Sequence, residues 1–147
     1  MRDENWLTTL FNHIWEKRFS DVQKKNNVVV HWRGKWKNKF GHIRRLKNKD
    51  TEIIINSLFR NEQVPEYVIE LTLAHELVHY MHGFHSPYPR LFKHPHRGGI
   101  VNKELRLRGY RDVLKKERLW FKEEWKNIYS EREETGRVRV KHIRSGF

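Results

Sequence analysis

The segment between Pro65 and Gly83 constrains the fold of this 147-residue chain more than any other. Its apolar residues recur at steps of three and four, which is the spacing that gathers side chains on one face of a helix. These residues are Val68, Leu71, Ala74, Leu77, Val78 and Met81. A proline followed by Glu66 suits the first turn of a helix, and a glycine suits its end. The pattern therefore predicts one long helix with a broad apolar face.

The elements on either side of this helix predict an α+β fold. A helix and three short strands rich in β-branched residues precede it, and further helices follow it. The predicted elements are a helix at 3–19, strands at 28–32, within 36–46 and at 53–55, a loop at 84–99, and helices at 100–108 and 112–130. Residues 137–144 alternate valine with basic residues and predict a strand or an unordered arm. This order is typical of a small twisted sheet packed against helices.

Length and composition indicate a single domain. A chain of 147 residues fits one domain, with a core at about 5–130 and a basic tail at 131–147. The absence of cysteine excludes disulfides, a thiol nucleophile and a cysteine-based zinc finger, and it fits a reducing cytoplasm. The N-terminus lacks the pattern of a signal peptide, and no segment reaches the length of a membrane span. We therefore expect a cytoplasmic protein without a membrane partner.

His75, Glu76 and His79 form an H-E-x-x-H motif within the predicted helix. Two histidines four residues apart lie on one helical face, so both imidazoles can reach one metal ion. The glutamate between them can take a proton from a metal-bound water. Zinc lowers the pKa of that water towards about 7 and polarises a scissile carbonyl. The motif predicts a zinc site that hydrolyses peptide bonds, with Glu76 as the general base.

A tetrahedral catalytic zinc site needs a third protein ligand. We expect it to be His85, because Gly83 could end the helix in a left-handed conformation and turn the chain back towards the metal. His82 lies one turn beyond His79, but three ligands along one straight helix diverge. The remaining candidates are His94, His96 and Glu104. For His82, His94 and His96, a position in solvent or one that supports a ligand without binding the metal is the simpler interpretation.

The stretch from His75 to His85 resembles the WLM zincin metallopeptidases, in which H-E-L-x-H is followed by a glycine and then a third histidine. Ser86 and Phe92 are similar to residues of the YgjP-like hydrolases, whose third histidine is followed by a serine and then an aromatic residue. The predicted strands resemble the sheet that precedes the active-site helix of SprT-like metallopeptidases. The resemblance covers about residues 5–95 and implies a zincin-like domain.

The chain departs from the SprT-like pattern in two respects. SprT-like proteins place their third histidine later; His94 sits at about that distance, but Pro95 rather than glycine follows it. They also often carry a cysteine-rich zinc ribbon, which this chain lacks. The resemblance implies proteolysis near DNA, including the removal of proteins crosslinked to DNA.

Positive charge is concentrated at the two ends of the chain. Residues 1–50 hold 13 basic and 5 acidic side chains, residues 51–92 hold 2 and 5, and residues 93–147 hold 16 and 8. Such an excess favours polyanions such as DNA or RNA. The candidate phosphate contacts are Arg33, Lys35, Lys37, Lys39, Arg44 and Arg45. Trp32 and Trp36 could stack on unpaired bases, but their even spacing favours burial on one face of a strand.

These features together predict a zinc-dependent metallopeptidase that acts on a protein or peptide substrate. The positive charge of the chain and its resemblance to SprT-like metallopeptidases extend the predicted substrates to proteins associated with DNA. Two alternatives use the same metal site: a nucleic-acid-binding protein without proteolytic activity, and a metal-dependent hydrolase of a non-protein substrate. A basic structural or toxin-like protein would need no metal. Metal content and a proteolysis assay, with and without DNA, separate these functions.

Overall fold

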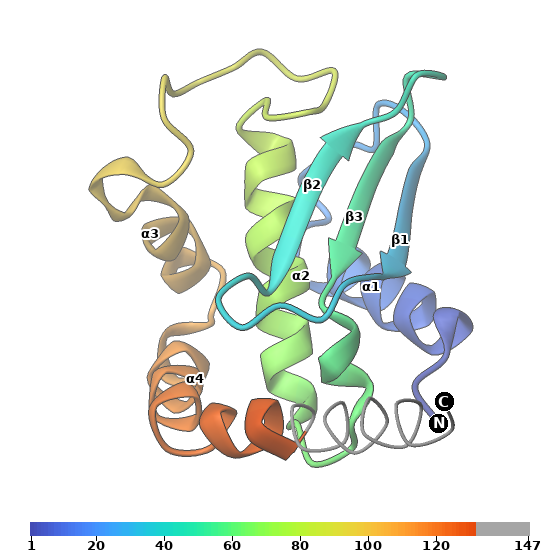
Figure 1. Ribbon diagram of the computed structural model, residues 1–147. Coiled ribbons are helices and arrows are strands. Elements are labelled where there is room, and N and C mark those ends of the chain that lie inside the picture. Colours follow the sequence, from blue (N-terminus) through green and yellow to red (C-terminus); the bar gives the residue numbers. More distant parts are fainter. Residues whose placement is uncertain (132–147) are drawn as a thin grey trace.

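The computed structural model describes residues 1–131, and the elements predicted within this range are present in the predicted order (Figure 1). They are α1 (Glu4–Arg18), β1 (Val28–Trp32), β2 (Gly41–Arg45), β3 (Thr51–Ile55), α2 (Glu66–Met81), α3 (Ile100–Leu107) and α4 (Arg111–Glu123), with short 3-10 helices at Ser57–Arg60 and Arg97–Gly99. The mixed content confirms the α+β class. The last predicted helix is interrupted at Glu124 and resumes over residues 125–131. The strand or arm predicted at 137–144 lies outside the described residues, as does the tail beyond residue 131.

The three strands form one mixed sheet in the order β1-β3-β2. β1 runs parallel to β3 with Val30 opposite Ile53, and β2 runs antiparallel to β3 with Ile43 opposite the same residue. All five residues of the central strand β3 are buried. Its run of β-branched isoleucines is typical of such a strand. In β1, buried and partly buried residues alternate, so Val28, Val30 and Trp32 are buried on one face. This topology leaves β2 at an edge of the sheet.

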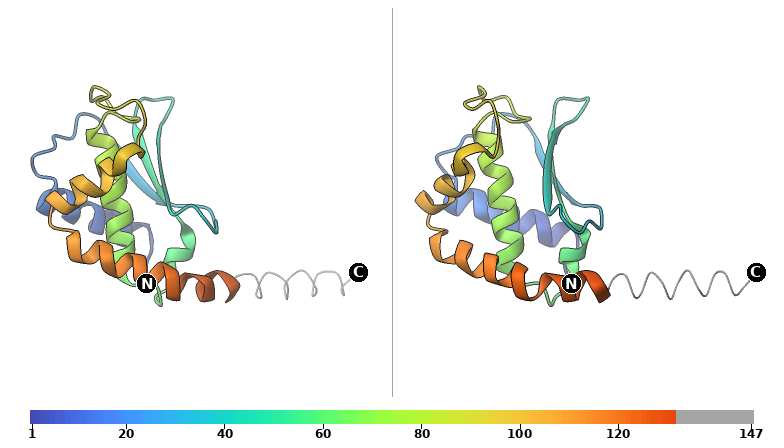
Figure 2. Two further views of the ribbon diagram at one scale, coloured as in Figure 1. Left: turned by 90° about the vertical axis from the view of Figure 1, so that its left-hand side faces the viewer. Right: turned by 60° about the vertical axis from the view of Figure 1, so that its left-hand side comes forward.

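The helix α2 lies between the sheet on one side and α3 and α4 on the other (Figures 1 and 2). It contacts α1, β2, β3, α3 and α4, so several of its faces are covered. Its buried residues are Val68, Ile69, Leu71, Thr72, Leu73, Ala74, Glu76, Leu77, Val78, His79 and Tyr80. None of the helices within residues 1–131 combines the length and the hydrophobicity that a membrane crossing requires. The central position of α2 places the H-E-x-x-H motif where the sheet and the last helices approach each other.

The loop after α2 turns towards the sheet and then returns across the end of α2 to α3 (Figure 1). Gly83 makes the turn with a φ of 84°, as predicted, and a Cβ there would lie 2.3 Å from the carbonyl oxygen of Pro89. Only glycine fits such a position. His85 follows with a φ of 57°, and its carbonyl accepts a 2.7 Å hydrogen bond from the Thr51 hydroxyl. This hydrogen bond attaches residue 85 to the start of β3.

Candidate metal centre

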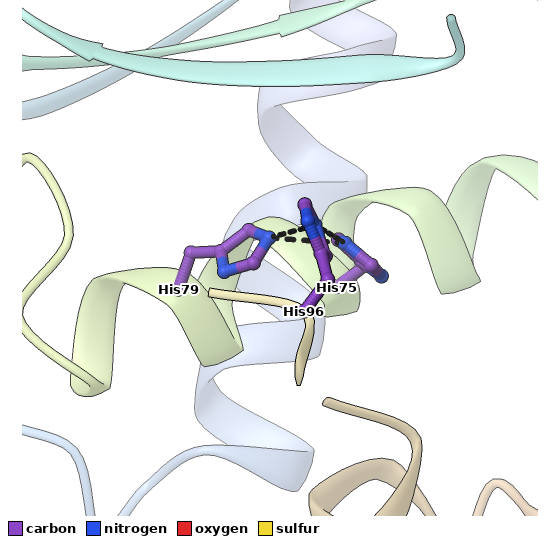
Figure 3. Close-up of side chains that lie close together, drawn as sticks. All are labelled: His75, His79 and His96. Atoms are coloured by element: carbon purple, nitrogen blue, oxygen red, sulfur yellow. Dashed lines mark hydrogen bonds between the residues drawn. The ribbon is translucent and has the colours of Figure 1, made fainter. Parts of the chain in front are cut away.

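Three histidine side chains converge beside α2 (Figure 3). His75 and His79 project from successive turns of that helix, and His96 comes from the loop just before α3. The Nε2 atoms are 3.0 Å apart between His75 and His79, 3.2 Å between His75 and His96, and 2.9 Å between His79 and His96. Three ring nitrogens that meet at one point can hold a metal ion.

The third histidine of this cluster is His96, whereas the sequence pattern predicted His85. His85 lines the same cavity, but its imidazole is not one of the three that converge. The physical reason is the path of the backbone. The turn at Gly83 directs the chain to the sheet, where the hydrogen bond from Thr51 holds residue 85. The chain returns to the end of α2 at Leu91 and Phe92, and His96 then meets His75 and His79. The later spacing of the SprT-like third histidine was the one sequence signal that pointed to this region.

The other candidate ligands do not join the cluster. His82 is buried, and its ring packs on Phe92 with 4.8 Å between the ring centroids. The carboxylate of Glu104 accepts a 2.9 Å hydrogen bond from Nε of Arg108 at the end of α3. His94 is exposed and is not one of the converging histidines. Each of these three side chains is therefore outside the cluster.

Both histidines from α2 are held in the neutral state. Burial is the main cause, and with the effect of neighbouring imidazoles it lowers the pKa of His75 to about 4 and the pKa of His79 to about 3. A metal ion binds the lone pair that a proton would otherwise occupy, so the neutral imidazole is the binding form. At neutral pH neither side chain has to release a proton before it binds a metal.

Glu76 lies beside the cluster with only 4% of its surface exposed. Burial raises the pKa of its carboxyl group to about 8, and the positive charge of Lys39 opposes this effect. Among the residues that the structure describes, none forms a hydrogen bond with Oε2 of Glu76. An unpaired buried carboxyl group is costly for folding, and such groups are concentrated at functional sites. Its pKa near neutrality suits a group that accepts and returns a proton.

The three histidines and Glu76 line one cavity of about 630 Å³. Its walls come from α2, from β2 with the residues just before it, and from the last two helices. The apolar lining residues are Phe40, Ile43, Leu71, Phe84, Leu105, Leu114 and Phe121. A cavity of this size that combines apolar walls with convergent polar side chains is typical of a site for a small ligand or for part of a larger one. It also contains Glu117 of α4, which the sequence analysis did not single out.

Gly41 allows β2 to approach α2 next to Glu76. A Cβ at this position would lie 2.8 Å from Cγ2 of Thr72 and 3.4 Å from Cγ of Glu76. We expect Gly41→Ala to displace Glu76 or to push β2 away, with a loss of stability of about 1–3 kcal/mol from overpacking. Chemical denaturation and metal titration would show a less stable protein that still binds the metal. The double variant Gly41→Ala/Thr72→Ser removes the closest methyl group and should recover most of the stability; no recovery would contradict this steric explanation.

Two of the six candidate phosphate contacts form ion pairs within the sheet. Arg44 lies opposite Glu52 in the register of β2 and β3, and its Nε donates a 2.6 Å hydrogen bond to that buried carboxylate. Arg33 approaches the same carboxylate at 3.7 Å. Their positive charge is therefore partly compensated on this face of the sheet. These ion pairs could not be predicted from the sequence, because they depend on the strand register.

The remaining four basic residues are exposed on the loop before β2 and at the end of that strand. They are Lys35, Lys37, Lys39 and Arg45. Trp32 is buried and stacks on Trp6 with 6.2 Å between ring centroids, as its spacing in the strand predicted. Trp36 is half-buried, and Nζ of Lys39 lies 5.0 Å from its ring centroid. Trp32 is thus not available to stack on a base.

The arrangement of its side chains is what supports the candidate site. It combines three convergent imidazoles, an unpaired buried carboxyl group and a cavity that all four side chains line. This arrangement can bind a metal ion and hold a proton acceptor beside it. Comparisons with family models, with curated proteins and with solved structures find no match to this chain.

Proposed function

We propose that the protein is a zinc-dependent metallopeptidase with a zincin-like domain. The observation that carries the proposal is the convergence of three histidine Nε2 atoms beside the buried carboxyl group of Glu76. The ligands proposed for the zinc ion are His75, His79 and His96, and the proposed general base is Glu76. Within the metal site, the proposal differs from the expectation drawn from the sequence in its third ligand only.

The histidine cluster fits a zinc ion. Ring nitrogens lie about 2.0–2.1 Å from zinc, so three of them in a tetrahedral arrangement are about 3.3–3.4 Å apart. The Nε2 atoms here are separated by 2.9 to 3.2 Å, which a slight outward movement of the rings converts to that spacing. Three neutral imidazoles with one open position form a donor set typical of catalytic zinc. Within residues 1–131, the buried Nδ1 of His79 lacks the hydrogen-bond acceptor that most zinc-bound histidines have.

Glu76 is the proton carrier in the proposed reaction. When bound, zinc supplies a Lewis acid that polarises the scissile carbonyl and makes a water acidic enough to attack at neutral pH. Glu76 accepts the proton of the attacking water and later passes it to the leaving amine. The charge of Lys39 lowers the pKa of Glu76 and thus favours its ionised, proton-accepting form. Burial excludes bulk water from the carboxylate and strengthens its interactions.

The exposed edge of β2 favours a peptide substrate. In the described part of the chain β2 pairs with β3 alone, so the backbone groups of its outer edge have no partner strand. Gly41, His42 and Ile43 of this strand also line the cavity. An extended peptide can add to such an edge through backbone hydrogen bonds. That binding mode would bring a peptide bond alongside Glu76, whereas a compact non-protein substrate would not use the strand.

Metal removal tests the proposed function directly. We expect purified protein to contain one zinc per chain by elemental analysis and to cleave an unfolded protein such as casein. A chelator should abolish cleavage, and added zinc should restore it.

Zinc without cleavage, both with and without single-stranded DNA, would favour a nucleic-acid-binding protein or a hydrolase of another substrate. Cleavage that appears only with DNA would support substrates associated with DNA, and the absence of any bound metal would contradict the proposal.

A further inference from the structure

Glu117 occupies a position in α4 where the sequence pattern calls for an apolar residue. The inward face of this helix carries Val113, Leu114, Trp120 and Phe121, all of which are at least partly buried. Glu117 lies three residues after Leu114 and four before Phe121, so it belongs to the same face. Glutamate is among the residues least often placed in such a stripe unless it is paired. A break of this kind in an otherwise consistent pattern is expected at a functional position.

Glu117 has no direct ion-pair partner among the described residues, although Lys39 lines the same cavity and four cationic side chains line the adjoining hollow. Glu117 lines the cavity of the histidine cluster together with the apolar side chains of Leu71, Leu114 and Phe121. No basic side chain in the described part of the chain lies within 4.0 Å of its carboxylate oxygens, and no hydrogen bond to them is present there. Burial accordingly raises the pKa of Glu117 to about 7. A cationic group that entered the cavity would remove this cost.

The chemistry of the cavity defines the group that would fit. The side chains of lysine and arginine combine an aliphatic stem, which can lie on apolar surface, with a terminal positive charge. The apolar walls suit the stem, and Glu117 suits the charge. A neutral side chain of the same length would leave the carboxylate unpaired, so it would bind less well.

We propose that Glu117 determines substrate specificity by selecting peptides with lysine or arginine next to the cleaved bond. The proposal rests on the metallopeptidase function proposed above and names the substrate class of the same site. Glu117 contacts the substrate side chain in this view and takes no part in the proton transfers of Glu76. The hollow next to the cavity is lined by Arg106, Arg111, Lys115 and Arg118, and it shares Glu117 as a wall residue. Those cations would repel the same substrate side chain, so the lysine or arginine stays on the Glu117 side of the cavity.

The experiment compares peptides that differ at one position only. In an otherwise identical peptide, the residue on either side of the cleaved bond is lysine, arginine, norleucine or glutamate. We expect the zinc-loaded wild type to cleave the lysine and arginine peptides with a kcat/KM about 10-fold to 100-fold above that for norleucine, the range that one buried charge pair can supply. Glu117→Gln should remove this preference and leave norleucine cleavage within about threefold. Glu123→Gln, an exposed charge change on the same helix, should keep it.

Two further measurements separate the inference from the function on which it rests. Glu117→Met restores the apolar stripe, so it should fold with equal or higher thermal stability and still lose the preference; a lower stability would indicate a merely structural role. Calorimetric binding of the uncut peptides to zinc-loaded Glu76→Gln should show the same preference for lysine without turnover. Equal binding and equal cleavage of the lysine and norleucine peptides, or preferred glutamate, would overturn the role of Glu117 while peptidase activity stands. Absence of cleavage of every peptide would instead count against the metallopeptidase.

Discussion

Glu76→Gln is expected to retain zinc and the fold but to lose about 10²–10⁴-fold in kcat, the contribution typical of a general base. Glutamine has the same shape as glutamate but cannot accept the proton of the attacking water. Peptide hydrolysis and zinc content, measured on the same preparation, check this result. Glu66→Gln, in the first turn of the same helix and exposed, is the matched control and should keep full activity. If Glu76→Gln turned over at the wild-type rate, Glu76 would have no part in the mechanism.

The same substitution should stabilise the metal-free protein at alkaline pH. Burial raises the pKa of Glu76 from its ordinary value of 4.5 to about 8. Between these two values the folded state binds the proton more tightly than the unfolded state, so the wild-type free energy of unfolding falls as the pH rises through this window. Glutamine carries no such proton. The stability of Glu76→Gln relative to wild type should therefore increase by a few kcal/mol between pH 4.5 and pH 8.

Urea denaturation of the chelated proteins at several pH values measures this difference. The other shifted groups, which include His75, His79 and Glu117, are present in both proteins, so their contributions cancel in the comparison. A stability difference that stays constant with pH would mean that Glu76 is not buried as a neutral acid in the metal-free state.

His96→Ala is expected to weaken zinc binding by at least about 100-fold, more than the 10–100-fold typical of losing an outer-shell partner. The reason is that its Nε2 lies 3.2 Å and 2.9 Å from those of His75 and His79, so the substitution leaves a two-histidine site. Competition with a chromophoric chelator measures the zinc affinity of each variant.

The matched control for this experiment is His85→Ala. Both side chains are exposed histidines of the segment between α2 and α3, so neither substitution is expected to disturb the core. The imidazole of His85 is outside the cluster, and zinc affinity should change by no more than a few fold. Release of zinc by His85→Ala, together with retention by His96→Ala, would restore the ligand set that the sequence resemblance implied.

Local sequence was enough to predict most of the secondary structure and three of the four side chains of the candidate site. The apolar spacing of residues 65–83 and the β-branched runs report on interactions between near neighbours, and the corresponding helix and strands are present. The two histidines of the motif lie four residues apart in α2, so the pitch of the helix alone brings them together. Glu117 was also visible in principle, as an acid within the apolar stripe of α4.

The third histidine could not be chosen from the sequence, because its position depends on contacts between distant segments. Four histidines follow His79 within a span of 17 residues, and no spacing rule favoured His96 over the other three. The choice was made by the path of the loop: the turn at Gly83 and the hydrogen bond from Thr51 place His85 at the sheet, and His96 then meets α2 on the way back.

Tertiary structure likewise decided which charges remain free. Arg44 and Glu52 are eight residues apart and become partners only through the antiparallel register of β2 and β3. Glu117 and Glu76 share a cavity only because α4 folds back beside α2. The sequence by itself determined the helix, the strands and the paired histidines, whose geometry follows from the repeat of the backbone. The third imidazole and the charges that face the cavity were decided by packing, because no local repeat relates residues that meet across a loop.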